Sequence, residues 1–409
     1  DDHAGFKIRA GSADPMSEVA VLRGGWFSLI SSATTAVVVG FASTILLIMQ
    51  AAQAVEATPA QQASWAAVLC FGMALTSFYL SWAHKMPIIT AWSTPGAALI
   101  ATSAAGVTYE HALGTFVVAG LLMCLTALVN PLAQAIARIP APLAAGMLAG
   151  VLLKYTLGVP VAALSMPLFV LPLIIAFFGL RLSYPLFAVP VVVVLGVTMA
   201  AFAGSFAGDC CAVGFTELVW TTPRFDGATI LSLGVPLFLV TMASQNLPGF
   251  AVLRASGYEP PVTSCLLTTG LASMAMAPFG SHAVNMAAIT ASLVTGPDAH
   301  PDPAKRWLVA WPYLILYVAV GLAAALFVQV LGSLPAALIT TIAGLALFSP
   351  LMGSVVAMLK EPRDIESALI TFLVTASGVT FYGVGSAFWG LVAGLVLFGA
   401  RHFLVTKKL

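Results

Sequence analysis

The chain has 409 residues, of which 60% are apolar and only 8% are charged, and its mean hydropathy is +1.02. Soluble domains carry roughly 25% charged residues, so this composition excludes an ordinary soluble fold and indicates a polytopic membrane protein surrounded by lipid. The net charge of +1, with no basic patch, excludes nucleic acid as the expected partner. Five cysteines do not make a disulfide framework, and the role of the adjacent Cys210 and Cys211 stays open.

Residues 1–15 are polar and aperiodic, and we interpret them as a leader outside the fold. The rest of the chain is a series of apolar segments. At about 20 residues per membrane-spanning helix, it holds about fourteen spans. They are expected near residues 24–50, 63–83, 87–106, 110–130, 140–158, 165–180, 183–203, 228–248, 260–277, 279–296, 307–331, 334–358, 364–380 and 382–404.

The distribution of charge predicts the orientation of these spans. If the N-terminus lies inside, the cations fall in the even-numbered connections: Lys85, Arg138, Arg181, Arg254, Lys305, Arg306, Lys360 and Arg363. The odd-numbered connections carry acidic residues and one cation: Glu56, Glu110, Asp209, Glu217, Asp226 and Arg224. Because positive charge accumulates on the cytoplasmic side, this alternation predicts a bacterial inner-membrane protein with both termini in the cytoplasm.

Two polar, Pro/Gly-rich patches interrupt apolar segments, at 87–96 and 277–285. Thr94 in the first and His282 in the second are 188 positions apart, which is about half of the chain. Seven spans per half would give the two halves opposite orientations. Paired breaks in inverted halves point to a substrate site, because a broken span exposes backbone groups that only protein or a watery cavity can satisfy.

The breaks carry the resemblance to a known family. Residues 87–99 (PIITAWSTPGAAL), 244–249 (SQNLPG) and 278–285 (PFGSHAVN) resemble the benzoate membrane transport family of bacterial benzoate/proton symporters. The resemblance covers essentially the whole chain after Met16. It implies an all-α polytopic fold of two inverted seven-segment repeats, shared with uracil and anion transporters. In this fold spans three and ten each begin as a short strand and continue as a half-helix.

The resemblance also implies two domains. Spans 1–4 and 8–11 would form a core domain from residues 16–136 and 228–332. Spans 5–7 and 12–14 would form a gate domain from residues 137–227 and 333–409. Alternating access would then come from movement of the core domain against the gate domain around a site near mid-membrane.

A small aromatic carboxylate needs donors for its charge and an apolar slot for its ring. No Arg or Lys lies in either break, so the N–H groups of the half-helix starts, near 94–97 and 282–285, are the expected donors. Hydroxyls can cap these starts, and an aromatic residue just before each can flank the ring. The predicted substrate-binding residues are Trp92, Ser93, Thr94, Gly96, Gln245, Asn246, Phe279, Ser281, His282 and Asn285.

For several of these residues a purely structural role is the alternative to substrate binding. Gly96 can serve helix packing, and Gln245 and Asn246 can tie span eight to its neighbours. Uracil-transporting relatives have glutamates where this chain has Gln245 and His282, so His282 is the predicted proton-coupling residue, with a neutral helix tie as the alternative. Lys154 either snorkels to the interface or attracts the anion.

These features together predict a secondary active transporter that imports benzoate, or a close aromatic carboxylate, with protons. The alternatives are a nucleobase/proton symporter of the same fold and an uncoupled anion channel. No nucleophile triad, metal cluster or phosphate loop occurs in the sequence, so no enzyme activity, catalytic residue, metal or cofactor is expected. A homodimer is left open.

Overall fold

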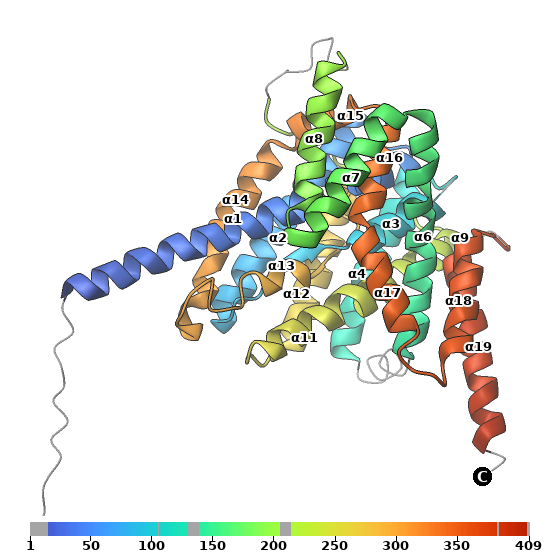
Figure 1. Ribbon diagram of the computed structural model, residues 1–409. Coiled ribbons are helices and arrows are strands. Elements are labelled where there is room, and N and C mark those ends of the chain that lie inside the picture. Colours follow the sequence, from blue (N-terminus) through green and yellow to red (C-terminus); the bar gives the residue numbers. More distant parts are fainter. Residues whose placement is uncertain (1–14, 105, 130–138, 205–213, 383, 407–409) are drawn as a thin grey trace, which may run out of the picture.

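The computed structural model describes residues 15–406 except 105, 130–138, 205–213 and 383, and it leaves out the side chains of residues 15–24, 43 and 402–406. The leader at 1–14 and the Cys210–Cys211 pair therefore lie outside the described residues. Pro15, assigned above to the leader, is instead the first residue of helix α1. In Figure 1 this long helix extends away from the body of the molecule at one end.

The described residues of the first half form seven apolar α-helices and one short strand. Their bounds are α1 Pro15–Ala54, α2 Pro59–His84, β1 Thr90–Trp92, α3 Thr94–Ser103, α4 Tyr109–Leu128, α6 Ala141–Ser165, α7 Pro167–Ser183 and α8 Ala188–Phe202. Both α6 and α7 carry an internal proline.

The second half is more interrupted. It contains α9 Gly227–Thr229, π-helix η1 Ile230–Gly234, α10 Val235–Thr241, π-helix η2 Met242–Asn246, α11 Leu247–Ala255, α12 Val262–Met276, 3-10 helix η3 Ala277–Phe279, β2 Val284–Met286, α13 Ile289–Ser292, 3-10 helix η4 Pro303–Val309, α14 Ala310–Leu322, α15 Ala324–Gly332, α16 Ala336–Ala346, α17 Phe348–Met358, α18 Ile365–Ser377 and α19 Ser386–Thr406.

Among the described residues, 7 helical stretches are long and apolar enough to cross a membrane. An eighth is the pair Pro303–Leu322 and Ala324–Gly332, which bends by 55° at the break. Four shorter apolar helices, α7, α8, α18 and α19, complete the set. The protein is therefore a mostly helical, multi-pass membrane protein.

The two strands lie far apart in sequence but pair with each other. β1 and β2 are antiparallel, with Ala91 opposite Asn285 at the centre of the register. Ser93 N donates to Ala283 O at 3.2 Å, and Ala287 N donates to Ile89 O at 2.9 Å, which extends the pairing at both ends. The two halves of the chain therefore meet through backbone hydrogen bonds.

A buried polar cluster supports β1 from behind. Thr90 Oγ1 lies 2.7 Å from Thr76 Oγ1 and 2.8 Å from Ser77 Oγ, both on α2. Tyr313 on α14 donates its hydroxyl proton to the carbonyl of Thr90 at 2.9 Å. These bonds satisfy polar groups that have no access to water, so Thr90 has the structural role of fixing the strand.

The second strand–helix unit differs from the prediction. The half-helix was expected to begin within 282–285, but this segment is extended and forms β2, and α13 begins only at Ile289. Asn285 is thus a strand residue, and neither Ser281 nor His282 lies at a helix start. The N–H of Val284 is bonded to Ser273 Oγ and that of Met286 to Asn246 Oδ1, so strand geometry consumes donors that were expected to face a ligand.

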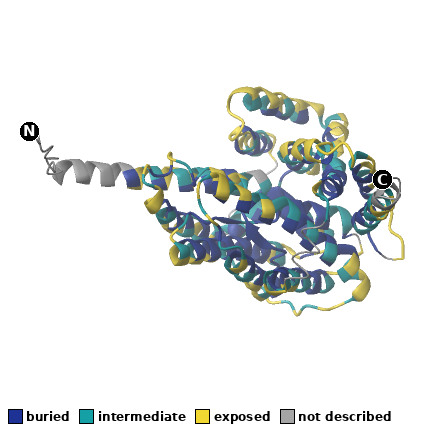
Figure 2. Ribbon diagram, turned by 90° about the horizontal axis from the view of Figure 1, so that it is seen from below, coloured by how far each residue is buried: buried dark blue, intermediate teal, exposed yellow. Residues whose placement is uncertain are grey.

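The helices separate into two sets of neighbours. One set contains the pairs α4–α12, α2–α14 and α1–α3, and in the other α6 packs against α16, α17 and α18 while α18 packs against α19. Figure 2 shows the buried residues gathered along the middle of the molecule, whereas the helices at the periphery expose one face. The exposed side chains include many large apolar ones, as expected for a surface in contact with lipid.

Candidate functional site

The start of α3 is capped by a side chain of its own segment. Ser93 Oγ accepts a hydrogen bond from Gly96 N at 3.1 Å and lies 2.9 Å from Thr241 Oγ1 of α10. The next donors of this helix start are aligned with the positive end of the helix dipole. Thr94, half-buried beside the cap, has no side-chain hydrogen bond in the described structure.

His282 connects the two breaks. Its Nδ1 lies 3.1 Å from Trp65 Nε1, and its Nε2 lies 2.9 Å from the carbonyl oxygen of Ser93. The indole N–H can only donate and the carbonyl can only accept, so Nδ1 must accept and Nε2 must carry the proton. The fully buried imidazole is therefore held as the neutral Nε2–H tautomer, with both nitrogens occupied, between the aromatic rings of Trp65 and Phe116.

Two π-helical turns interrupt the helical run that carries the amide pair. η1 precedes Pro236 and η2 precedes Pro248. A proline within a helix lacks the N–H donor and its ring presses on the carbonyl four residues earlier, and a wider turn relieves both problems. These prolines were the available sequence signal for the π-helices, which the sequence reasoning did not use. π-Turns occur frequently at functional sites.

The second π-turn gives its two amides different environments. Asn246 is fully buried, and it accepts from Met286 N at 2.9 Å and donates to Met242 Sδ at 3.2 Å. Gln245 is half-buried, and its side chain makes no hydrogen bond to the described residues. Gln245 follows Thr241, which bonds Ser93, by four residues, so its free amide belongs to the same helical run as the partner of the α3 cap.

The two predicted aromatic residues are turned to other partners. Trp92 is 3% exposed, donates from Nε1 to Thr44 Oγ1 at 2.7 Å and packs against Phe41 on α1. Phe279 packs edge-on against Trp220, ten residues before α13 begins. Phe279 therefore does not stand at a helix start, and the expectation that it does so was wrong.

Glycine 96 is enclosed by its neighbours. A Cβ at this position would lie 2.5 Å from Leu237 Cδ1 and 2.7 Å from Ser93 Oγ. Close approach of α10 to α3 therefore requires glycine here.

Three buried polar atoms around the second break have no hydrogen-bond partner: Ser281 Oγ, Asn285 Oδ1 and Tyr109 Oη. Asn285 uses its Nδ2 to donate to the carbonyl of Met286 at 2.9 Å, which leaves only its oxygen free. Buried polar atoms without partners are uncommon in folded proteins. Together with Thr94 and Gln245, Ser281 and Asn285 are the predicted site residues that retain unused hydrogen-bonding capacity.

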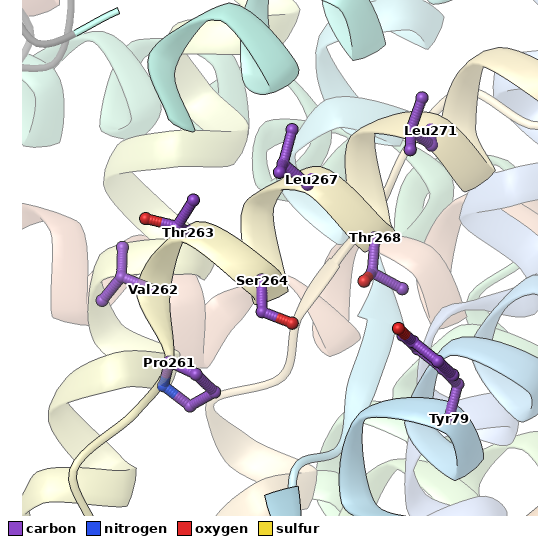
Figure 3. A pocket seen from close by; sticks show the side chains of 8 residues that line it. All are labelled: Tyr79, Pro261, Val262, Thr263, Ser264, Leu267, Thr268 and Leu271. Atoms are coloured by element: carbon purple, nitrogen blue, oxygen red, sulfur yellow. The ribbon is translucent and has the colours of Figure 1, made fainter. Parts of the chain in front are cut away.

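A groove of about 600 Å³ lies elsewhere, between α2 and the start of α12 (Figure 3). Its lining residues are Tyr79, Pro261, Val262, Thr263, Ser264, Leu267, Thr268 and Leu271. None of them belongs to the predicted site, and Tyr79 and Leu271 are exposed, by 50% and 58%. We do not assign the groove to the site.

The fold has solved counterparts among membrane transporters. The transmembrane domain of the cyanobacterial bicarbonate transporter BicA is 15% identical, covers 91% of this chain and 97% of its own, and superposes with a TM-score of 0.56. The murine anion transporter Slc26a9 in the inward-facing state is also 15% identical, with 98% of this chain and 74% of that chain covered and a TM-score of 0.58. The chain thus shares its fold with these two polytopic membrane proteins.

The sequence narrows this class to one family. Residues 26–399 match the model of the benzoate membrane transport protein family. The inner membrane protein YdcO of Escherichia coli is 38% identical over 375 residues, covering 91% of this chain and 95% of that protein. The benzoate membrane transport protein of Acinetobacter baylyi is 31% identical over 372 residues, covering 91% and 93%. The chain belongs to the benzoate membrane transport protein family, as its sequence motifs predicted.

Proposed function

We propose that this protein is a secondary active transporter that imports benzoate, or a close aromatic carboxylate, together with protons across the bacterial inner membrane. The observation that carries the proposal is the family match over residues 26–399. It is supported by the names of two full-length relatives, a benzoate membrane transport protein and an inner membrane protein.

The proposal includes fourteen membrane segments in two inverted halves, with both termini cytoplasmic. The seven long helical stretches, the bent pair and the four shorter apolar helices account for twelve of them. The remaining two would be the strand–helix units β1–α3 and β2–α13, each crossing as one broken span. The antiparallel pairing of β1 with β2 supports opposite orientations for the two units.

The proposal assigns alternating access to two domains. The core domain would comprise residues 16–136 and 228–332, and the gate domain residues 137–227 and 333–409. Packing supports this division, because α6 binds α16, α17 and α18, whereas α4 binds α12 and α2 binds α14. α6 also contacts α3 and η2, so a movement of the gate domain would act directly on the proposed site.

The proposed site receives the carboxylate beside the start of α3. Gln245 would donate from its amide, and Thr94 from its hydroxyl, because neither side chain is used by the protein itself. Ser93, Asn246 and Trp92 would hold the site in place through the bonds described above, rather than contact the substrate. Ser281 and Asn285 would complete the polar lining with the buried atoms that lack partners.

Coupling to protons follows from the charge of the substrate. Benzoic acid, with a carboxyl pKa near 4, is almost wholly anionic at neutral pH. Moving one negative charge into a negative-inside cell costs about 2.3 kcal/mol per 100 mV, which a co-transported proton removes. The proposed proton acceptor is His282, which would have to release the Trp65 N–H before Nδ1 could take up a proton.

Uptake by proteoliposomes tests the function. Purified protein is reconstituted, and labelled benzoate uptake is measured with the outside made acidic and with no pH gradient. The proposal expects saturable accumulation driven by the gradient. Uptake that only equilibrates would favour an uncoupled anion pathway, and competition by uracil or xanthine would favour a nucleobase carrier.

The role of the Gln245 amide is tested by a substitution. Gln245→Ala should weaken benzoate binding by roughly 1–3 kcal/mol if the amide donates to the carboxylate in a site without water. Gln62→Ala is the matched control, because this half-buried amide donates to the Ala57 carbonyl just before its own helix and bonds neither break. Unchanged binding in Gln245→Ala would reduce Gln245 to a packing residue.

The proton role is tested with His282→Gln, which keeps hydrogen bonding and removes titration. We expect this variant to exchange labelled benzoate across the membrane but to lose accumulation driven by pH. Trp65→Phe sharpens the test, because it frees Nδ1 without changing His282. Accumulation with an unaltered pH profile in His282→Gln would mean that the proton travels elsewhere and that His282 is a tie between the breaks.

A further inference from the structure

Lys154 is an isolated charge within the apolar helices. Within the apolar stretches of the described helices, which leave out α1 before Gly25 and α19 after Arg401, it is the only Asp, Glu, Lys or Arg that lies beyond the first or last turn. It lies thirteen residues after the start of α6 and eleven before its end. The described residues provide no acidic partner for it, since the one ion pair they form joins Arg401 to Glu366.

One face of α6 explains where the ammonium group goes. Gly146, Gly150 and Lys154 follow one another at four-residue spacing, so they lie along one side of the helix. A Cβ at Gly146 would lie 2.5 Å from the Ala368 carbonyl oxygen, and one at Gly150 would lie 2.7 Å from Thr375 Cβ, so this side packs closely on α18. Lys154 continues the same side at the level where α18 ends.

The side chain reaches the C-terminal end of α18. Gly378 ends α18 with a φ of +69°, and a Cβ there would lie 2.2 Å from Lys154 Nζ. Glycine thus serves two needs at this position, a left-handed backbone and room for the ammonium group. The residue is half-buried against the end of a helix, where the negative end of the dipole attracts a cation.

The loop after Gly378 leads from this point to the proposed core domain. It runs to Gly385, where a Cβ would lie 3.9 Å from Ser103 Cβ at the end of α3 and 3.4 Å from the Ser232 carbonyl oxygen in η1. Lys154 thus stands at the start of the α18–α19 connection, whose other end approaches the last residue of α3. The half-helix that begins at the proposed carboxylate site ends at this same junction.

We propose that Lys154 is a substrate-positioning residue that binds the carboxylate of the anion on the gate side of the pathway. The inference rests on the proposed function and adds a residue to it. The C-terminal end of α18 offsets only part of the cost of this cation, and charged residues within membrane-spanning segments mark substrate and ion pathways. The chain supplies no carboxylate at Lys154, and the proposed substrate carries one.

Binding of labelled benzoate to purified protein in nanodiscs tests the inference. Lys154→Met removes the charge at similar volume, and Lys154→Arg retains it. We expect Lys154→Met to raise the Kd for benzoate roughly tenfold to a hundredfold, as for loss of a hydrogen bond to a charged group. Lys154→Arg should stay within about threefold of wild type. Lys85→Met is the control, because this cation lies over Trp307 at 4.0 Å, away from the junction.

A second variant leaves Lys154 in the chain. Gly378→Ala should displace the ammonium group and raise the Kd in the same direction. Gly257→Ala is its matched control, since Gly257 has a φ of +86° but nothing within 4 Å of its added Cβ. If Lys154→Met fails to fold, the comparison of Gly378→Ala with Gly257→Ala still tests whether Lys154 binds the carboxylate.

Wild-type affinity in Lys154→Met, or in Gly378→Ala where Lys154→Met does not fold, would overturn the inference while the proposed function stands. A melting temperature lowered with Kd unchanged would identify Lys154 as a tie at the end of α18. If wild-type protein itself fails to bind or transport benzoate, the proposed function fails first, and the inference fails with it.

Discussion

The two strand–helix units satisfy the backbone hydrogen-bond donors at their breaks by different means. In β1–α3 the helix has ten residues and begins at Thr94 directly after its cap, Ser93, whose hydroxyl accepts from Gly96 N. In β2–α13 the helix has four residues and no side-chain cap. The donors of β2 are satisfied from outside, by Ser273 on α12 and Asn246 on η2.

The difference shows which unit can accept a ligand at a helix start. A long helix with a local cap keeps an ordered set of N–H groups at its N-terminus. The donors of the second unit are bonded to neighbouring helices and to β1. The second unit therefore acts as a brace: it supports the first unit and offers no free donors to a ligand. Substitutions in the brace should therefore act mainly on stability.

The largest effect is expected at Gly280, which precedes β2 with a φ of +113°. An added Cβ would lie 2.7 Å from Trp65 Cβ and 2.9 Å from the Tyr109 hydroxyl. Gly280→Ala should cost roughly 3 kcal/mol or more, because strain and overpacking add. The apparent melting temperature of the purified protein measures it. Gly257→Ala, with a left-handed backbone in open space, should cost only about 1 kcal/mol, and equal losses would refute the packing argument.

Asn246→Ala should have the next largest effect. It removes the acceptor of the buried Met286 N–H, so an unsatisfied donor remains at a cost of roughly 2–3 kcal/mol. Thermal unfolding is again the measurement, and Ser244→Ala is the control, since Ser244 bonds only the Val240 carbonyl of its own helix. A stable Asn246→Ala protein that no longer binds benzoate would instead make Asn246 a ligand-binding residue.

Ser93→Ala should cost less, about 1 kcal/mol, because only a helix cap is lost. The expected signature is a small fall in melting temperature with a larger fall in benzoate affinity, since the start of α3 would fray beside the proposed site. Ser93→Asn retains a capping oxygen and should recover most of the stability. A loss of stability with unchanged affinity would mean that the start of α3 does not bind the substrate.

The smallest effect concerns a charged cap outside the membrane-spanning segments. Hydrogen bonds from the Thr229 side chain and backbone hold the pKa of Asp226 below its usual value. This contribution is therefore present above the ordinary carboxyl pKa near 4 and is lost as the pH falls through the lower folded value. Asp226→Asn should lower the melting temperature slightly at neutral pH, where the contribution is present, and should flatten the acid limb of the melting-temperature profile. An unchanged melting temperature at pH 7 with an unchanged acid limb would contradict the assignment.

The comparison also shows what the sequence could predict. The first unit was located within a residue because its signals are local: the cap Ser93, the following Pro95 and an apolar run. The second was misplaced because its strand depends on a partner in the other half of the chain and on two side chains of separate helices. No local pattern in Ser281–Met286 carries that information.

The same holds for the candidate site. Residue types alone selected the amide pair, but only the contacts separate Gln245, which is free, from Asn246, which is bonded. The role of His282 likewise remains a prediction, although its two partners define which proton movement it would require.

The small sheet also has a consequence for how the protein is made. β1 leaves the ribosome roughly two hundred residues before β2, which at about 5–20 residues per second is a delay of roughly 10–40 s. During that time the edge of β1 has no partner strand, in a membrane that offers no water to replace one. The backbone groups of β1 therefore need other hydrogen-bond partners, from the insertion machinery or from water retained around the strand, until β2 is made and pairs with them.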